Sequence, residues 1–141
     1  MAIGDYKVCI DEANAFLHTA ESCIKGDYMS LLSGKMYPFV VNAAFSCELY
    51  IKGIMIHNSA TMEFETGHNL KNLFSQLNTT EQTAIKTLYD QKSTQDIYEF
   101  LNESGNAFVE WRYALEKGVN INITSLRAFA HALKEYVTGL T

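Results

Sequence analysis

The sequence predicts an all-α fold, an up-and-down helical bundle of four longer helices with short helices inserted between the second and the third. In each longer segment apolar residues recur at steps of three and four, which is the spacing of a helix with one buried face. No segment has the pattern of a parallel sheet. One proline, eight glycines and 19% charged residues in 141 positions give no sign of a linker, so residues 1–141 are expected to form a single domain.

The first two helices are expected at residues 5–25 and 39–57. The apolar spacing of the first is carried by Cys9, Ala13, Phe16, Ala20, Cys23 and Ile24. Gly26 can end this helix. In the second, Pro38 occupies a first-turn position that tolerates proline, and "FVVNAAFSCELYIKGIMIH" is apolar nearly all round. Such a helix is expected to be central and packed on several sides.

Two short helices are expected after a loop at residues 58–67. The segment "HNLKNLFSQL" turns Leu70, Leu73, Phe74 and Leu77 to one face, with Asn69 or His68 as its N-cap. The segment "NTTEQTAIKTLYDQ" is expected to begin at Thr79 or Thr80 and to bury Ile85, Leu88 and Tyr89.

The last two longer helices are expected at residues 94–117 and from Thr124 onward. The first has a long core-facing stripe of Ile97, Phe100, Leu101, Ser104, Phe108, Trp111 and Leu115. Alternating apolar residues at 119–123 predict a short extended stretch. Thr124 would then cap a closing helix that buries Leu126, Phe129, Ala130, Leu133, Val137 and Leu140.

The charge balance limits the kinds of ligand. A net charge of −5 argues against a broadly basic nucleic-acid surface, so any contact with RNA has to be local. The 11 basic residues include only two arginines, Arg112 and Arg127. Arginine is the side chain best shaped to bind carboxylate or phosphate with two hydrogen bonds, so both are candidate functional residues.

We expect a cytoplasmic protein that does not span a membrane. Three cysteines, Cys9, Cys23 and Cys47, are an odd number without close pairs, which favours reduced and buried thiols. The first residues carry charges too early for a signal peptide. Polar and charged residues interrupt the apolar stretch 39–56, which argues against a transmembrane helix.

Glu48 lies within an apolar helix, where a carboxylate without a partner would cost several kcal/mol. Lys52, four positions later, is a local partner, but a pair of that kind contributes only about 0.3–0.5 kcal/mol and suits a solvent-facing edge. Arg112 and His68 are partners from other helices. The preferred interpretation is a buried network that ties the central helix to its neighbours. Structural ion-pair networks of this kind are a common setting for buried charged residues. The alternative is a pocket for nucleotide or RNA.

Arg127 and His131 are four positions apart and therefore share one face of the closing helix, opposite its apolar residues. A cation that holds phosphate beside an imidazole that moves a proton would suit RNA cleavage through the 2′-hydroxyl, across a dimer interface. The simpler interpretation is an ordinary exposed polar face that continues through Lys134 and Glu135. No metal site is predicted: Glu65 with His68, and His18 with Glu21, are isolated pairs without a second copy. No cofactor motif was found either.

Three segments, "AAFSCELYIKGIM", "GHNLKNLF" and "FVEWRYALE", together resemble the HEPN superfamily, the higher-eukaryote and prokaryote nucleotide-binding domains. The positions that carry the resemblance are Glu48, Lys52, Gly67, His68, Leu70, Leu73, Arg112, Tyr113 and Glu116. The resemblance implies a helical bundle, often a homodimer, and in many members a metal-independent ribonuclease of toxin–antitoxin, defence or RNA-processing systems. The nuclease pattern has a longer gap on the final helix than "RAFAH", with a polar residue after the arginine.

Three functions follow as hypotheses. The favoured one is a non-catalytic HEPN-like bundle that binds a nucleotide, RNA or a cognate protein, because the acidic charge and the shortened final-helix pattern weaken the nuclease hypothesis. The second is an endoribonuclease that uses Arg127 and His131 across a homodimer. The third is a plain protein-interaction module.

Overall fold

A computed structural model describes residues 6–24, 36–58, 69–104 and 122–140. Every regular element in these ranges is a helix: α1 (Tyr6–Ile24), α2 (Met36–Asn58), α3 (Leu70–Ser75), α4 (Thr79–Asp90), α5 (Ile97–Ser104) and α7 (Ile123–Thr138). The all-α helical bundle predicted from the sequence is confirmed.

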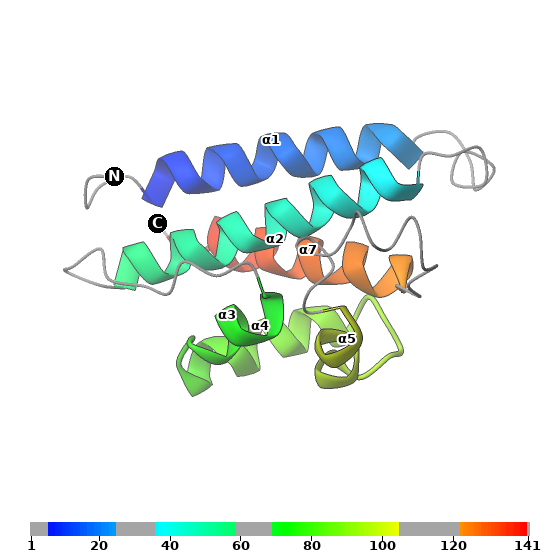
Figure 1. Cartoon of the computed structure of the whole chain (residues 1–141). Helices are drawn as coiled ribbons and strands as arrows, with labels where there is room; N and C mark the ends of the chain where they lie inside the picture. Colours follow the sequence, from blue (N-terminus) through cyan, green and yellow to red (C-terminus); the bar gives the residue numbers. More distant parts are fainter. Residues whose placement is uncertain (1–5, 25–35, 59–68, 105–121, 141) are drawn as a thin grey trace.

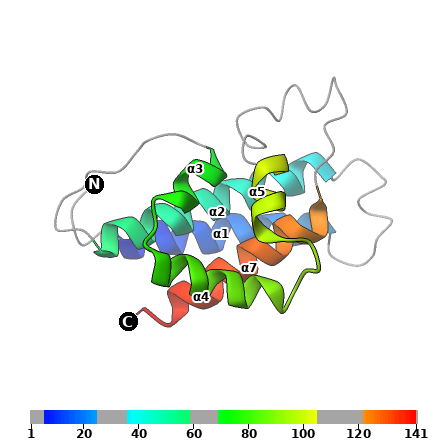
Figure 2. The same ribbon diagram turned by 90° about the horizontal axis from the view of Figure 1, so that it is seen from below.

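The helices form two layers. α1 lies along α2, and α7 packs against α2 and also contacts α1 (Figure 1). Below them, α3, α4 and α5 form the second layer, and α4 crosses beneath α7 (Figure 2). α7 therefore belongs to the first layer and faces the second, with contacts to α1, α2, α4 and α5.

α1 and α2 pack closely because small residues line their contact. α1 buries Cys9, Ala13, Leu17 and Ala20. A Cβ atom at Gly53 would lie 2.7 Å from Ile10 Cδ1, so only glycine fits there without a shift of Ile10. Ser46 also donates a hydrogen bond of 2.9 Å to the carbonyl of Ala13, and this bond satisfies the buried hydroxyl.

The predicted inward face of α1 needs one correction. Leu17 is buried in place of Phe16, which is half-buried and stacks on Phe45 with ring centroids 4.5 Å apart. Leu17 is four positions after Ala13 and three before Ala20, so it continues the buried face, whereas Phe16 lies about 100° around the helix from it. Cys9 and Cys47 are buried thiols, as predicted, whereas Cys23 is partly exposed.

α2 is the central helix that the sequence predicts, with buried residues on nearly every side. Length and composition alone would allow its Pro38–Asn58 stretch to cross a membrane, with a mean hydropathy of 1.4. The core helix of a soluble protein has the same two properties, and 67% of the apolar window is buried inside the bundle. Packing within the protein is thus sufficient to explain why α2 is so apolar.

Aromatic rings join α7 to the lower layer. Phe129 of α7 lies 5.6 to 6.5 Å, between ring centroids, from Phe74 of α3, Tyr89 of α4 and Phe100 of α5. All four rings are fully buried, and such edge-to-face and tilted contacts stabilise beyond simple burial. These contacts hold the Phe129 face of α7 in the core, so the opposite face of the helix lies at the surface.

Asparagines cap three of the helices, α3, α4 and α7, and in α4 and α7 they do so in place of the threonines that follow them. Asn69 caps α3, as one of the two predicted choices. α4 begins at Thr79, as predicted, but its cap is Asn78 and not a threonine. The Asn78 side chain accepts from the backbone of Glu81 at 2.8 Å in a reciprocal capping box.

α7 is capped by Asn122 and not by Thr124, since the Asn122 side chain accepts from the backbone of Ser125 at 3.0 Å. Ile123, predicted to be extended, is the first residue of α7. An asparagine one or two positions earlier supplies the oxygen that the first turn needs.

The third longer helix is confirmed over part of its predicted length. α5 begins at Ile97 and not near Thr94, because the Asp96 carboxylate accepts from the backbone of Tyr98 and Glu99 at 3.0 and 3.1 Å. Its predicted stripe is buried as far as Ser104. The continuation to residue 117, the extended positions 119–121 and the loop at 59–67 lie outside the described residues.

Candidate functional site

α7 presents one polar face. Leu126, Phe129 and Leu133 point into the core, so Arg127 and His131 point outward, as the sequence predicts. Glu135 lies one further turn along the same face. Because four residues advance a helix by about 6 Å, the three side chains form a row.

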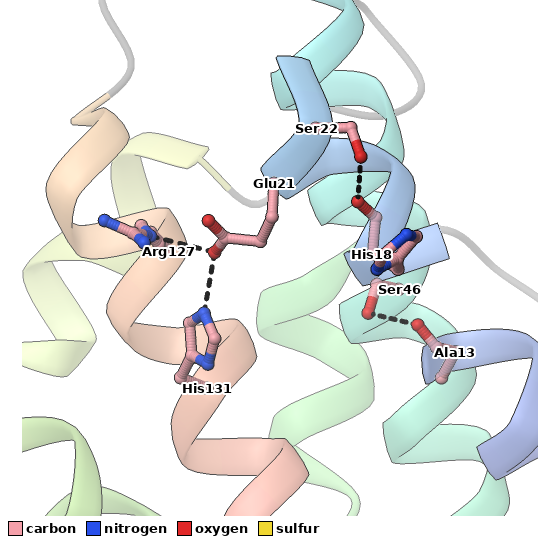
Figure 3. A network of polar contacts seen from close by, with 7 residues as sticks. All are labelled: Ala13, His18, Glu21, Ser22, Ser46, Arg127 and His131. Atoms are coloured by element: carbon pink, nitrogen blue, oxygen red, sulfur yellow. Dashed lines mark hydrogen bonds and ion pairs between the residues drawn. The ribbon is translucent and has the colours of Figure 1, made fainter. Parts of the chain in front are cut away.

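Glu21 of α1 joins Arg127 and His131 (Figure 3). One oxygen of this carboxylate, Oε1, accepts the Nε–H of Arg127 at 2.8 Å. The same oxygen lies 2.7 Å from Nε2 of His131. A carboxylate that carries charge only accepts hydrogen bonds, so Nε2 of His131 carries a proton and Nδ1 is left as the second ring nitrogen. The structure thus brings the two predicted residues together on a third residue.

The environment keeps Glu21 ionised. Partial burial raises its pKa, but the hydrogen bonds and positive charges of Arg127 and His131 lower it by more, so the pKa lies below the ordinary value. Glu21 stands near the C-terminal end of α1, where the helix dipole disfavours a negative charge. The cations of α7, and not α1 itself, therefore stabilise this carboxylate.

A shallow hollow of about 270 Å³ opens beside the row. Its lining residues are Lys92, Thr124, Arg127, Ala128, His131 and Glu135. Ala128 is small, and this leaves space between the long side chains on either side. Lys92 follows the end of α4, and its Nζ lies 2.6 Å from Glu135 Oε1.

A second hollow, of about 470 Å³, adjoins the first and shares Lys92 and Thr124 with it. Its other lining residues are Asp90, Gln91, Ser93, Thr94 and Asn122, so the lining is polar throughout. The two hollows together cover the junction between the end of α4 and the start of α7.

Glu48 is buried, with only 2% of its surface exposed, as its place in an apolar run implies. Lys52 Nζ lies 3.6 Å from Glu48 Oε1, and the lysine side chain is only 14% exposed. The local pair with Lys52 therefore forms, but away from the solvent-facing edge that suits a pair of this kind. α2 is covered on that side as well, so both ends of the pair are largely removed from water.

The remaining residues of the predicted polar cluster, His68, Arg112, Tyr113 and Glu116, lie outside the described residues. Pairing of Glu48 with a cation from another helix therefore stays a prediction. Within the described ranges, no group of three or more His, Cys, Asp or Glu residues could hold a metal ion.

Sequence reasoning missed the roles of Glu21, Lys92 and Glu135. Glu21 appeared only as half of an isolated pair with His18, which is exposed and does not contact it. Nothing in a single sequence shows that a carboxylate on the first helix meets cations on the last. Glu135, in contrast, belongs to the polar face that the sequence predicts, one helical turn beyond His131, and only its pairing with Lys92 was missed.

No protein-family model, curated protein or solved structure matches this chain. The resemblance to the HEPN superfamily therefore remains a resemblance carried by three short segments. Of these, residues 43–55 lie wholly within α2, whereas residues 108–116 lie outside the described ranges.

Proposed function

We propose that this chain is a HEPN-like helical bundle that binds the phosphate of a nucleotide or of RNA, without cleaving it, at the hollow beside Arg127 and His131. The observation that carries the proposal is that the Arg127 guanidinium keeps hydrogen-bond donors available for a ligand. It uses only Nε for Glu21, and its two Nη groups make no hydrogen bond within the described part of the chain. Arg127 is 52% exposed, so these donors are accessible to a ligand.

The surroundings of Arg127 also suit a phosphate. Lys92 lines the same hollow and adds a second permanent positive charge. Paired guanidinium and ammonium groups are common ligands of phosphate. The whole chain is acidic, so this local group of cations is the kind of limited surface through which such a protein can contact RNA.

The sizes of the two hollows suit a ligand with two parts, a phosphate group and a nucleoside. Pockets that enclose a whole small molecule usually measure about 300–1,000 Å³, and the first hollow is smaller. It would hold a phosphate group, while the sugar and base extend into the second hollow beyond Lys92 and Thr124.

Binding can be measured by fluorescence anisotropy with a 3′-labelled single-stranded octaribonucleotide and, in competition, with ATP, in buffer that contains EDTA. We expect Arg127→Ala to weaken binding about tenfold or more, because a charge-assisted hydrogen bond contributes about 1.5–3 kcal/mol. Lys71→Ala, an exposed lysine of α3, is the matched control and should bind like the unaltered chain. Equal binding by the Arg127→Ala variant, or no binding by the unaltered chain, would contradict the proposal.

A second candidate function, metal-independent RNA cleavage, is supported by the Glu21–His131 contact. With the Glu21 carboxylate on Nε2, Nδ1 is the ring nitrogen left to act as a base. That nitrogen would take the proton of a ribose 2′-hydroxyl, the 2′-oxygen would attack phosphorus, and the 5′-oxygen would leave. Arg127 would hold the phosphate, and a homodimer would bring two such pairs together.

Labelled RNA incubated with the chain in EDTA separates the two candidates. Cleavage that is abolished by His131→Ala but not by His68→Ala would support the nuclease. Binding without cleavage would support the first proposal. A strictly monomeric chain would contradict the composite dimer site.

A further inference from the structure

This inference rests on the proposed phosphate site. Each cation of that site already has a carboxylate of the chain beside it. Glu21 neutralises Arg127 at 2.8 Å, and Glu135 neutralises Lys92 at 2.6 Å. The two permanent cations and the two carboxylates sum to zero. An external anion therefore has to compete with anions of the same chain.

At Arg127, the anion that competes with an external ligand is Glu21. It is attached to α1, which packs along α2, so it needs no loss of translational freedom to return to Arg127. Because Arg127 is half exposed, the contact itself is weak and can be exchanged. A ligand succeeds only if it offers the cations more than Glu21 does.

We propose that Glu21 is a specificity-determining residue that makes the hollow select phosphate monoesters, as found in a free nucleotide or at the 5′ end of RNA, over phosphodiesters and carboxylates. A carboxylate or an internal phosphodiester carries one negative charge, the same as Glu21, so exchange brings no electrostatic gain. A monoester carries about −1.5 to −2 charges at pH 7 and three acceptor oxygens. These can contact the Nη groups of Arg127 and the Nζ of Lys92 together.

The test compares two octaribonucleotides that differ only in a 5′-phosphate or a 5′-hydroxyl, both labelled at the 3′ end. We expect the unaltered chain to bind the 5′-phosphorylated RNA about tenfold more tightly. In Glu21→Gln the 5′-hydroxyl RNA should gain about two- to fivefold, and the ratio should fall to about threefold or less.

Glu12→Gln is the matched control because it changes the net charge equally on an exposed position of α1. Nine residues separate it from Glu21, about 13 Å along the helix, which exceeds the screening length of about 8 Å at physiological salt. This variant should keep the tenfold ratio.

Competition with AMP distinguishes the two sources of the monoester. Displacement of the RNA by AMP supports a nucleotide as the ligand, and displacement only by 5′-phosphorylated RNA supports an RNA end. Equal binding of both RNAs by the unaltered chain, or an unchanged ratio in Glu21→Gln, would overturn this inference and leave the proposed phosphate binding intact. Binding of neither RNA nor AMP would overturn both.

Discussion

Glu21 and Arg127 stand 106 positions apart in the sequence, yet Arg127 Nε lies 2.8 Å from Glu21 Oε1. The bundle topology brings them together, since α1 and α7 both pack against α2. The contact holds the Nε–H of Arg127 at the Glu21 carboxylate (Figure 3), and the two Nη groups make no hydrogen bond within the described part of the chain.

Removal of Arg127 should raise the pKa of Glu21. In Arg127→Ala the burial of Glu21 would remain, while a hydrogen bond and a nearby positive charge would be lost. The pKa can be measured from the pH dependence of the Glu21 carboxyl carbon resonance by NMR. Lys134→Ala, an exposed lysine of the same helix, should leave it unchanged. An equal pKa in Arg127→Ala and the unaltered chain would show that the contact does not form in solution.

The same contact predicts how stability depends on pH. The pKa of Glu21 is lower in the folded chain than the ordinary value of 4.5, so the pair stabilises the fold above that pH. Its contribution should be lost as pH falls through the lower, folded value. Urea unfolding of the unaltered chain and Glu21→Gln should therefore differ at pH 7, by about 0.2–1 kcal/mol, and converge in acid. A difference that grows as the pH falls would contradict this sign.

Glu48 should matter more for stability than any exposed acidic residue. Removal of one partner from a buried ion pair typically costs about 3–5 kcal/mol, and Glu48 lies buried beside Lys52. Glu48→Ala should lower the free energy of unfolding by about this amount, as measured with urea. Asp90→Ala, which removes the exposed pair of Lys86 and Asp90, is the matched control and should cost less than about 1 kcal/mol. Equal losses in the two variants would rule out a buried pair at Glu48.

The capping of α4 gives a separate prediction. Asn78→Ala should destabilise the chain by about 1 kcal/mol, because the Glu81 backbone would lose its acceptor. Thr79→Ala and Thr80→Ala should have smaller effects, since neither side chain caps the helix. Thermal unfolding of the three variants checks this directly, and a larger loss in either threonine variant would assign the cap to a threonine.

The close contact of α1 and α2 should not tolerate a larger residue. Gly53→Leu would drive side-chain atoms into Ile10 and Cys9, and overpacking of this kind costs about 1–3 kcal/mol. Gly139→Ala has only an ordinary contact, 3.5 Å from the Tyr136 carbonyl, and should be nearly neutral. If the urea midpoints of both variants match the unaltered chain, the two helices are not packed as described.

The fold could be predicted because its signals are local. Apolar spacing identified α1, α2 and α7, and the residues predicted inward on α7 from Leu126 to Val137 are buried. The errors fall where two local signals compete. Asn78 and Asn122 win over the threonines that follow them, because asparagine is the stronger N-cap.

The candidate site was predicted only in the part that one helix determines. Arg127 and His131 share a face because they are four positions apart, and this needs no knowledge of the fold. Glu21 and Lys92 come from other segments, and their contacts with α7 depend on how the helices pack. The sequence of one helix does not show which carboxylate of another helix will contact it.

The most direct test of phosphate binding at Arg127 is the NMR signal of its Nε–Hε group during addition of 5′-phosphorylated RNA. The chain has two arginines, so loss of one signal in Arg127→Ala assigns the resonance. We predict that this signal shifts progressively and saturates with the binding curve measured by anisotropy. A signal that stays in place while the RNA binds, or RNA that does not bind at all, would contradict the central claim.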